Sequence, residues 1–286
     1  MPDAAPLAGS EPLVDVHAHF YHAACGRADW QAVNESRMRA GRRIGITVHI
    51  ASILGSWGHR SPTYFPSPDD ISDANDAMEA VQHAHPDRVR AYIVVNPNHA
   101  AHALEEIARG VERGAVGIKL AASRRADDPL LDPIAEAAGR HGLPVLHHIW
   151  QHRRRDWPGQ EASDAMEYAR LARRHPHVAF ILAHIGGGGD WAHSYPAVAD
   201  VPNILLDLSG SGVDRGMLDQ ALAAVGAERM LWGCDVTMDT GLAKWWALEV
   251  LAPGRDALTA IRWRNAARIF PQGALPGLVP ASGGVR

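Results

Sequence analysis

Residues 15–20 read DVHAHF, an apolar run that carries two histidines at alternate positions. Successive side chains of a β-strand point to opposite faces, so residues two apart share one face. We therefore expect His17 and His19 to reach the same point in space. Imidazole is a common zinc ligand, and two imidazoles at the end of a strand form half of a metal site if other segments add donors. Because the chain has 17 histidines, the pair alone could equally be chance.

Eight apolar runs alternate with segments of helical periodicity. The runs are continuously hydrophobic and their connections are short, which is typical of parallel strands buried on both faces. The pattern predicts a single-domain α/β fold, a closed (β/α)8 TIM barrel. The competing doubly wound sheet needs a glycine-rich phosphate turn after an early strand, which this sequence lacks. The predicted strands are 15–20, 44–54, 90–96, 115–120, 143–150, 178–185, 204–209 and 230–235, and the predicted helices are 28–43, 72–85, 100–113, 132–140, 162–174, 191–199, 217–225 and, in two pieces, 241–270.

The chain has 286 residues, 47% of them hydrophobic, which is enough for one large core. We expect the barrel to span residues 13–270. Residues 1–12 are then an N-terminal extension, and residues 271–286, rich in Pro, Gly and Ala, are a flexible C-terminal tail.

Charge and composition exclude several classes of partner. A formal net charge of -4 gives no general attraction to nucleic acid or to an anionic membrane, so a small-molecule substrate is favoured. The N-terminus lacks a signal-peptide pattern, and no run approaches the roughly 20 apolar residues of a membrane span. We expect a soluble, cytoplasmic protein. Cys25 and Cys234 are too few for a disulfide framework and are expected to be free thiols. A disulfide bridge between them that forms only under some conditions is the less favoured alternative.

Polar side chains gather at the carboxyl ends of the predicted strands, where barrels of this kind assemble their active sites. Polar groups at the ends of apolar strands are costly to bury without partners, so their clustering at one end is informative. These residues are His17, His19, Lys119, His147, His148, His184 and Asp235.

Seven segments carry a family likeness: DVHAH (15–19), AHPDR (84–88), GIKL (117–120), LPVLHH (143–148), AHIGG (183–187), GCD (233–235) and NAARIF (265–270). In this order and spacing, the chain resembles the metal-dependent amidohydrolase superfamily. It is most similar to the amidohydrolase-related branch, which also contains aminocarboxymuconate-semialdehyde-type decarboxylases. The resemblance implies one divalent metal ion, with zinc expected first and manganese or iron as alternatives. The ligands that it implies are His17, His19, His148 and Asp235.

The resemblance also suggests roles for the neighbouring residues. Strand alternation lets only one residue of the pair His147 and His148 face inward, so His147 is expected in the wall of the site or behind a ligand. In some binuclear relatives a lysine on the fourth strand is carboxylated and bridges two metals. We favour one metal, with Lys119 as a cation that binds substrate or supports the structure. Relatives are usually dimers, which leaves a homodimer open.

The implied chemistry involves His184 and Asp235. His184 matches a histidine that contacts substrate or moves protons, and the alternative is a buried histidine bonded to backbone. Asp235 could bind the metal and accept a proton from water, and the alternative is an aspartate in the turn after a strand. Cys234 and Val236-Thr237 depart from the serine and the aromatic-proline pair of many relatives, which leaves the substrate contacts open.

Two reactions fit these residues. A bound divalent ion lowers the pKa of its water and polarises a carbonyl, which predicts hydrolysis of a small amide, lactone or ester. The alternative is non-oxidative decarboxylation of a carboxylated aromatic or muconate-like acid. A third reading is a catalytically silent binding protein, since a fold does not guarantee chemistry.

Substrate contacts are expected from the segments that follow the second, fifth and sixth predicted strands. Arginine suits bidentate recognition of carboxylate, so the arginines after the fifth strand suggest an acidic substrate, although a solvated basic patch explains them as well. Lys119 and His147 complete the list of expected contacts. The residues expected from these segments are Tyr64, Trp150, Arg153, Arg154, Asp190 and Trp191.

Overall fold

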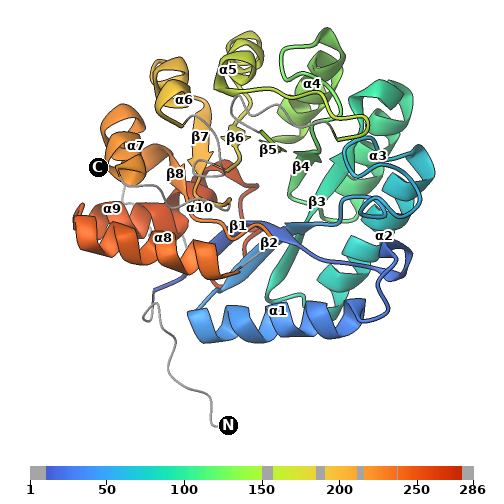
Figure 1. Cartoon of the computed structure of the whole chain (residues 1–286), viewed down its shortest axis with the longest axis horizontal. Helices are drawn as coiled ribbons and strands as arrows, with labels where there is room; N and C mark the ends of the chain where they lie inside the picture. The colour runs from blue at the N-terminus through green and yellow to red at the C-terminus, as the bar shows by residue number, and fades with distance from the viewer. Residues whose placement is uncertain (1–10, 150–156, 185–190, 211–215, 237, 279–286) are drawn as a thin grey trace.

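The computed structural model describes residues 11–149, 157–184, 191–210, 216–236 and 238–278. Eight parallel strands hydrogen-bond to one another in chain order, which confirms the predicted barrel. Figure 1 shows these strands at the centre of a ring of helices. The strands are β1 Val14–His19, β2 Val48–Ser52, β3 Val89–Val95, β4 Gly117–Leu120, β5 Val145–His147, β6 Phe180–Leu182, β7 Ile204–Asp207 and β8 Met230–Leu231.

The barrel closes where the chain that follows β8 meets β1. The Val16 amide donates to the Trp232 carbonyl over 3.1 Å, and the Asp235 amide donates to the His17 carbonyl over 2.6 Å. Ala18 and Asp235 form a parallel bridge beyond the end of β8. This closure brings residues more than 200 positions apart in the sequence to one edge of the barrel.

Helices follow the strands and form the outer layer (Figure 1). Each predicted helix is present, with its ends shifted by a few residues, and short 3-10 turns precede or follow several of them. Apart from the 3-10 turns, the helical elements are α1 Trp30–Ile44, α2 Pro68–Ala84, α3 Ala100–Glu112, α4 Asp132–His141, α5 Ala165–Arg174, α6 Trp191–Val198, α7 Met217–Val225, α8 Met238–Leu251, α9 Arg255–Thr259, the π-helical turn η5 Ala260–Arg264 and α10 Asn265–Ile269.

Two boundaries differ from the predictions for identifiable reasons. Helix α1 continues through Ile44, where the β-branched pattern predicted the start of a strand, and it ends at Gly45 in a left-handed conformation with φ 99°. Helix α2 begins at Pro68, four residues before the predicted start. Ser67 caps it, with its hydroxyl accepting from the Asp70 amide, and proline suits the first helical position.

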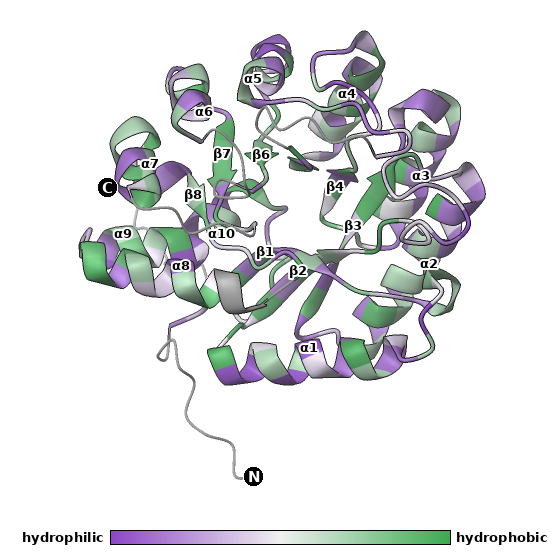
Figure 2. Cartoon of the chain, in the orientation of Figure 1, coloured by the Kyte–Doolittle hydropathy of each residue, from purple (hydrophilic) through white to green (hydrophobic). Residues whose placement is uncertain are grey.

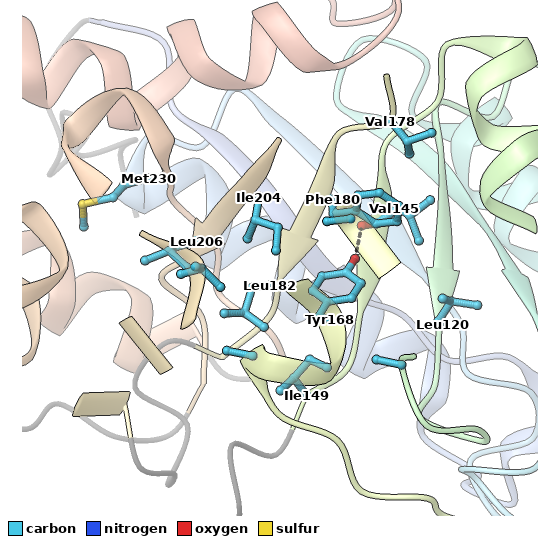
Figure 3. Packing of buried hydrophobic residues seen from close by; sticks show 14 of the residues in the cluster. Leu120, Val145, Ile149, Tyr168, Val178, Phe180, Leu182, Ile204, Leu206 and Met230 are labelled. Carbon is cyan, nitrogen blue, oxygen red and sulfur yellow. Dashed lines mark hydrogen bonds between the residues drawn. The ribbon is translucent and has the colours of Figure 1, made fainter. Parts of the chain in front are cut away.

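The core has an inner and an outer part. Inside the barrel, Val14, Ile50 and Leu146 pack around Tyr92, whose hydroxyl donates to the Val16 carbonyl over 2.8 Å. The larger outer cluster fills the space between strands and helices. There the Tyr168 hydroxyl of α5 donates to the Val145 carbonyl over 2.7 Å (Figure 3). Figure 2 shows mainly hydrophobic strands at the centre, surrounded by helices that mix hydrophobic and hydrophilic residues.

The described part of the predicted C-terminal tail, residues 271–278, packs against the barrel. Leu275 is buried in the inner cluster, and the Arg90 guanidinium donates to the Ala274 carbonyl over 2.6 Å. Within the described residues, no helix has both the length and the apolar character needed to cross a membrane.

Candidate metal centre

Three donor side chains meet where β1 and the chain after β8 lie side by side. His17 and His19 project from the same face of β1, as predicted, and Asp235 follows β8. The two Nε2 atoms are 3.2 Å apart, and Asp235 Oδ1 lies 3.8 Å from His17 Nε2 and 3.3 Å from His19 Nε2. A point equidistant from these three atoms lies about 2.0 Å from each, which is the length of a zinc bond to nitrogen or oxygen. The three side chains therefore fit a divalent metal ion.

The remaining ring nitrogens of both histidines are hydrogen-bonded on the opposite side. His17 Nδ1 lies 2.6 Å from Asp207 Oδ2. His19 Nδ1 lies 3.1 Å from the hydroxyl of Ser52 and 3.3 Å from its carbonyl oxygen. Metal-binding histidines in proteins characteristically bond their other nitrogen to a carboxylate, carbonyl or hydroxyl, which fixes the ring. Both Nε2 atoms consequently face the point where the ion would lie.

The surroundings shift the pKa values of the three donor side chains toward the forms that bind metal. It is the main reason that the pKa values of His17 and His19 lie below their usual range, so both rings are neutral near pH 7, as metal ligation requires. Burial alone would raise the pKa of Asp235, but His184 and the hydrogen bond with His19 hold it well below its usual range. Asp235 is therefore ionised, with its charge directed at the two imidazoles.

Two residues at the site have left-handed backbone. His184, after β6, has φ 63°, and Asp235, after β8, has φ 61°. Such conformations are uncommon for residues other than glycine and cost about 1–3 kcal/mol each when imposed by the surroundings. His184 Nδ1 lies 3.5 Å from Asp235 Oδ2. The strain thus falls on the two residues that the sequence assigned to proton transfer.

Lys119 projects from β4 into the same space and is fully buried. Its Nζ lies 2.8 Å from His17 Nε2. Burial lowers the pKa of Lys119 from 10.5 to about 8, against the attraction of Asp235 and Asp207. The predicted interior cation is thus in direct contact with one of the candidate metal donors.

His148 lies beside the three-donor group. Its Nδ1 is 2.8 Å from Nε2 of His184. Among the described residues, the group close enough to share one ion contains His17, His19 and Asp235, so His148 remains a predicted fourth ligand. The Tyr64 ring lies 5.2 Å from the His148 ring, so Tyr64 lies beside the predicted fourth ligand and remains a predicted substrate contact. Trp57, which the sequence analysis did not select, has its ring 5.2 Å from that of His19.

Other predicted contacts are placed away from the donors or outside the described residues. His147 packs its ring 5.4 Å from Tyr168 of α5, between barrel and helix, and burial lowers its pKa to about 4. Trp191 begins α6 and packs against Tyr195 with ring centroids 5.6 Å apart. The predicted residues that lie outside the described parts are Trp150, Arg153, Arg154 and Asp190.

The side chains that support the donors were not identified from the sequence pattern. Asp207 and Ser209, at the end of β7, and Ser52, at the end of β2, contact the histidines from behind. One signal was available, because all three end apolar strands in the same way as the donors do. Only the closed barrel shows which donor each of them contacts.

Comparison with known proteins identifies the family to which this chain belongs. A model of the Amidohydrolase family matches residues 14–272, and the chain belongs to this family. No curated protein matches the chain.

Solved structures with the same fold include several decarboxylases. The chain is similar to 2,6-dihydroxybenzoate decarboxylase in complex with 2,6-dihydroxybenzoate, with 18% identity, a TM-score of 0.69 and coverage of 91% of this chain and 98% of that chain. It is also similar to 5-carboxyvanillate decarboxylase from Sphingomonas paucimobilis, with 18% identity, a TM-score of 0.67 and coverage of 91% and 99%. A dihydroxybenzoic acid decarboxylase from Polaromonas sp. JS666, with bound manganese and 2-nitroresorcinol, has 16% identity, a TM-score of 0.70 and coverage of 91% and 97%.

Proposed function

We propose that this protein is a metal-dependent, non-oxidative decarboxylase of a small aromatic carboxylic acid. The observation that carries the proposal is the group formed by the buried His17 and His19 with the partly exposed Asp235, in a barrel whose structural relatives include decarboxylases of hydroxylated benzoic acids. Hydrolysis, which the sequence put first, becomes the second candidate. The family description favours it, and Asp235 could accept a proton from water in that reaction.

We infer that the donors are His17, His19 and Asp235, with His148 as the fourth. Two or three imidazoles with one carboxylate suit zinc, manganese or iron, so the donor set alone does not select the metal. When bound, the ion would neutralise and orient the negatively charged oxygens of the substrate. Lys119 adds a second positive charge in the same space, which favours an anionic substrate over a neutral amide or ester.

The protein's own residues supply the proton that the reaction needs. Decarboxylation replaces the carboxylate on a ring carbon with hydrogen, so one proton is consumed for each carbon dioxide released. We infer that His184 delivers it, since His184 Nδ1 lies 3.5 Å from Asp235 Oδ2 and the ionised carboxylate favours the protonated imidazole. After the ring carbon is protonated, the bond to the carboxylate breaks and its electron pair returns to the ring. Tyr64 and Trp57 provide aromatic surface near His148 and His19 for such a ring.

The experiment is a product assay on protein loaded with Zn²⁺ or Mn²⁺. Hydroxylated and methoxylated benzoic acids labelled with ¹³C in the carboxyl group are offered in D₂O beside a panel of lactones, amides and esters. We expect labelled carbon dioxide and deuterium at the vacated ring carbon, with both signals lost in His17→Ala. Turnover of a lactone, amide or ester without carbon dioxide release would replace the proposal with hydrolysis. Metal binding without turnover of any of these compounds would favour the third interpretation, a catalytically silent binding protein.

A further inference from the structure

Asp207 lies directly behind the candidate metal centre, at the carboxyl end of β7. Its side chain is fully buried, and its Oδ2 is 2.6 Å from Nδ1 of His17. This nitrogen is opposite the one that faces His19 and Asp235. A fully buried carboxylate is costly unless it is hydrogen-bonded, so its presence here needs an explanation.

We propose that Asp207 is a positioning residue of the metal centre, which holds His17 in the tautomer with its proton on Nδ1 and its lone pair on Nε2. The inference rests on the metal-binding part of the proposed function and adds a residue to it. In the other tautomer, Nε2 would carry a proton and could not bind an ion. The Asp207 carboxylate accepts a hydrogen bond from Nδ1 only in the tautomer that leaves the Nε2 lone pair available for a metal ion.

Contacts on the other side of the His17 ring point to the same tautomer. Lys119 Nζ lies 2.8 Å from Nε2. An ammonium group donates hydrogen bonds and cannot accept them, so Nε2 must be the acceptor in this contact. The hydrogen bonds at both ends of the ring therefore assign the proton to Nδ1.

Asp207 is itself held in place from two directions. The Ser209 amide donates to Oδ1 over 2.8 Å, and the Ser209 hydroxyl donates to Oδ2 over 2.5 Å. Gly233 of the GCD segment allows the carboxylate to approach, because a Cβ there would lie 2.3 Å from Asp207 Oδ1 and 3.1 Å from the His17 Cβ. The glycine at this position thus has a steric reason that the sequence pattern alone does not reveal.

The first test reads the tautomer directly in the unaltered protein. The ¹⁵N chemical shifts of the His17 ring are measured in metal-free protein labelled at histidine and assigned by comparison with His17→Gln. We expect Nδ1 to have the shift of a protonated nitrogen and Nε2 that of an unprotonated one. A proton on Nε2 would overturn the proposal. This measurement requires neither turnover nor a variant of Asp207.

The second test measures the affinity for Zn²⁺ and for Mn²⁺ by competition with a chelator. Asp207→Asn keeps the shape but lets the amide donate to Nδ1, which permits the wrong tautomer, so we expect affinity to fall about 10–100-fold. Asp70→Asn is the matched control, since Asp70 is also buried and hydrogen-bonded, by Ser56 over 2.8 Å, but lies outside the donor group. Unchanged affinity in folded Asp207→Asn would overturn the proposal.

Gly233→Ala provides an independent variant that leaves the carboxylate in the sequence. Its methyl group would displace Asp207 from His17, so we expect a similar loss of affinity and a His17 tautomer that is no longer uniform. Wild-type affinity and a wild-type ¹⁵N spectrum in this variant would contradict the assigned contact. Because all readouts concern metal binding, failure of the decarboxylase assay would leave this inference standing, and its own failure would leave the reaction open.

Discussion

Nζ of Lys119 lies 2.8 Å from Nε2 of His17, the nitrogen that also faces His19 and Asp235. The lone pair of Nε2 can be directed at the lysine or at a metal ion, but it cannot serve both fully. In the absence of metal, Lys119 therefore occupies the hydrogen-bonding direction that an ion would use. An ion that binds at the centre must displace this hydrogen bond and is repelled by the positive charge of Lys119.

We predict that Lys119→Met binds metal more tightly than the wild type. Methionine keeps the length and the apolar stem but removes the competing hydrogen bond and the charge. The gain should be about tenfold in affinity, or about 1.4 kcal/mol, because charge interactions inside proteins are strongly attenuated. Chelator competition at pH 7 measures it. A fall from two ions per chain in the wild type to one in the variant would instead identify Lys119 as a carboxylated bridge.

The three donors should be required for metal binding. We expect about one ion per chain in the wild type by elemental analysis, and its loss in His17→Ala, His19→Ala and Asp235→Asn, by more than the roughly 10–100-fold typical of supporting residues. His49→Ala is the control, because His49 is equally buried but is hydrogen-bonded to Asp15 over 2.9 Å. Full metal occupancy in His17→Ala would show that the ion binds elsewhere.

The sequence predicted the barrel and the convergence of His17 and His19 because both depend on local patterns. Strand alternation places His17 and His19 on one face, and the carboxyl ends of parallel strands meet at one end of a barrel. The supporting contacts depend instead on closure. Asp207 and Ser52 reach their histidines across distances of 190 and 33 positions in the chain, which no periodicity encodes. His147, which was expected in the wall of the site or behind a ligand, packs its ring outward against Tyr168.

His184 should matter for turnover more than for metal binding. Asparagine tolerates the left-handed backbone that His184 adopts at φ 63° but cannot relay a proton at neutral pH. We expect His184→Asn to keep metal affinity within about threefold of the wild type while kcat falls about 10²–10⁴-fold, as for loss of a general acid. Exposed His141 on α4 gives the control variant, His141→Asn. Loss of metal in His184→Asn would make His184 a ligand.

Lys119 and Lys244 are the only two lysines in the sequence, and both are fully buried. Every other basic side chain apart from histidine is an arginine. Lys244, on α8, donates to the Gly210 carbonyl over 2.6 Å, just beyond the β7 residues that contact His17. Burial lowers its pKa from 10.5 to about 8, against the attraction of Asp207 and Asp235. Burial of this ammonium group therefore adds a cost to folding at neutral pH.

The cost of burying the Lys244 ammonium group should make the stability of the protein depend on pH. Between pH 8 and 10.5 the unfolded chain holds the Lys244 proton more firmly than the folded chain, so stability rises with pH in this window. The full effect is at most about 3 kcal/mol, from about 1.36 kcal/mol for each pKa unit. Lys244→Met removes it, so the unfolding free energy of wild type minus variant, measured in urea, should increase from pH 7.5 to pH 10. A difference that stays constant with pH would mean that Lys244 has an ordinary pKa in the folded protein.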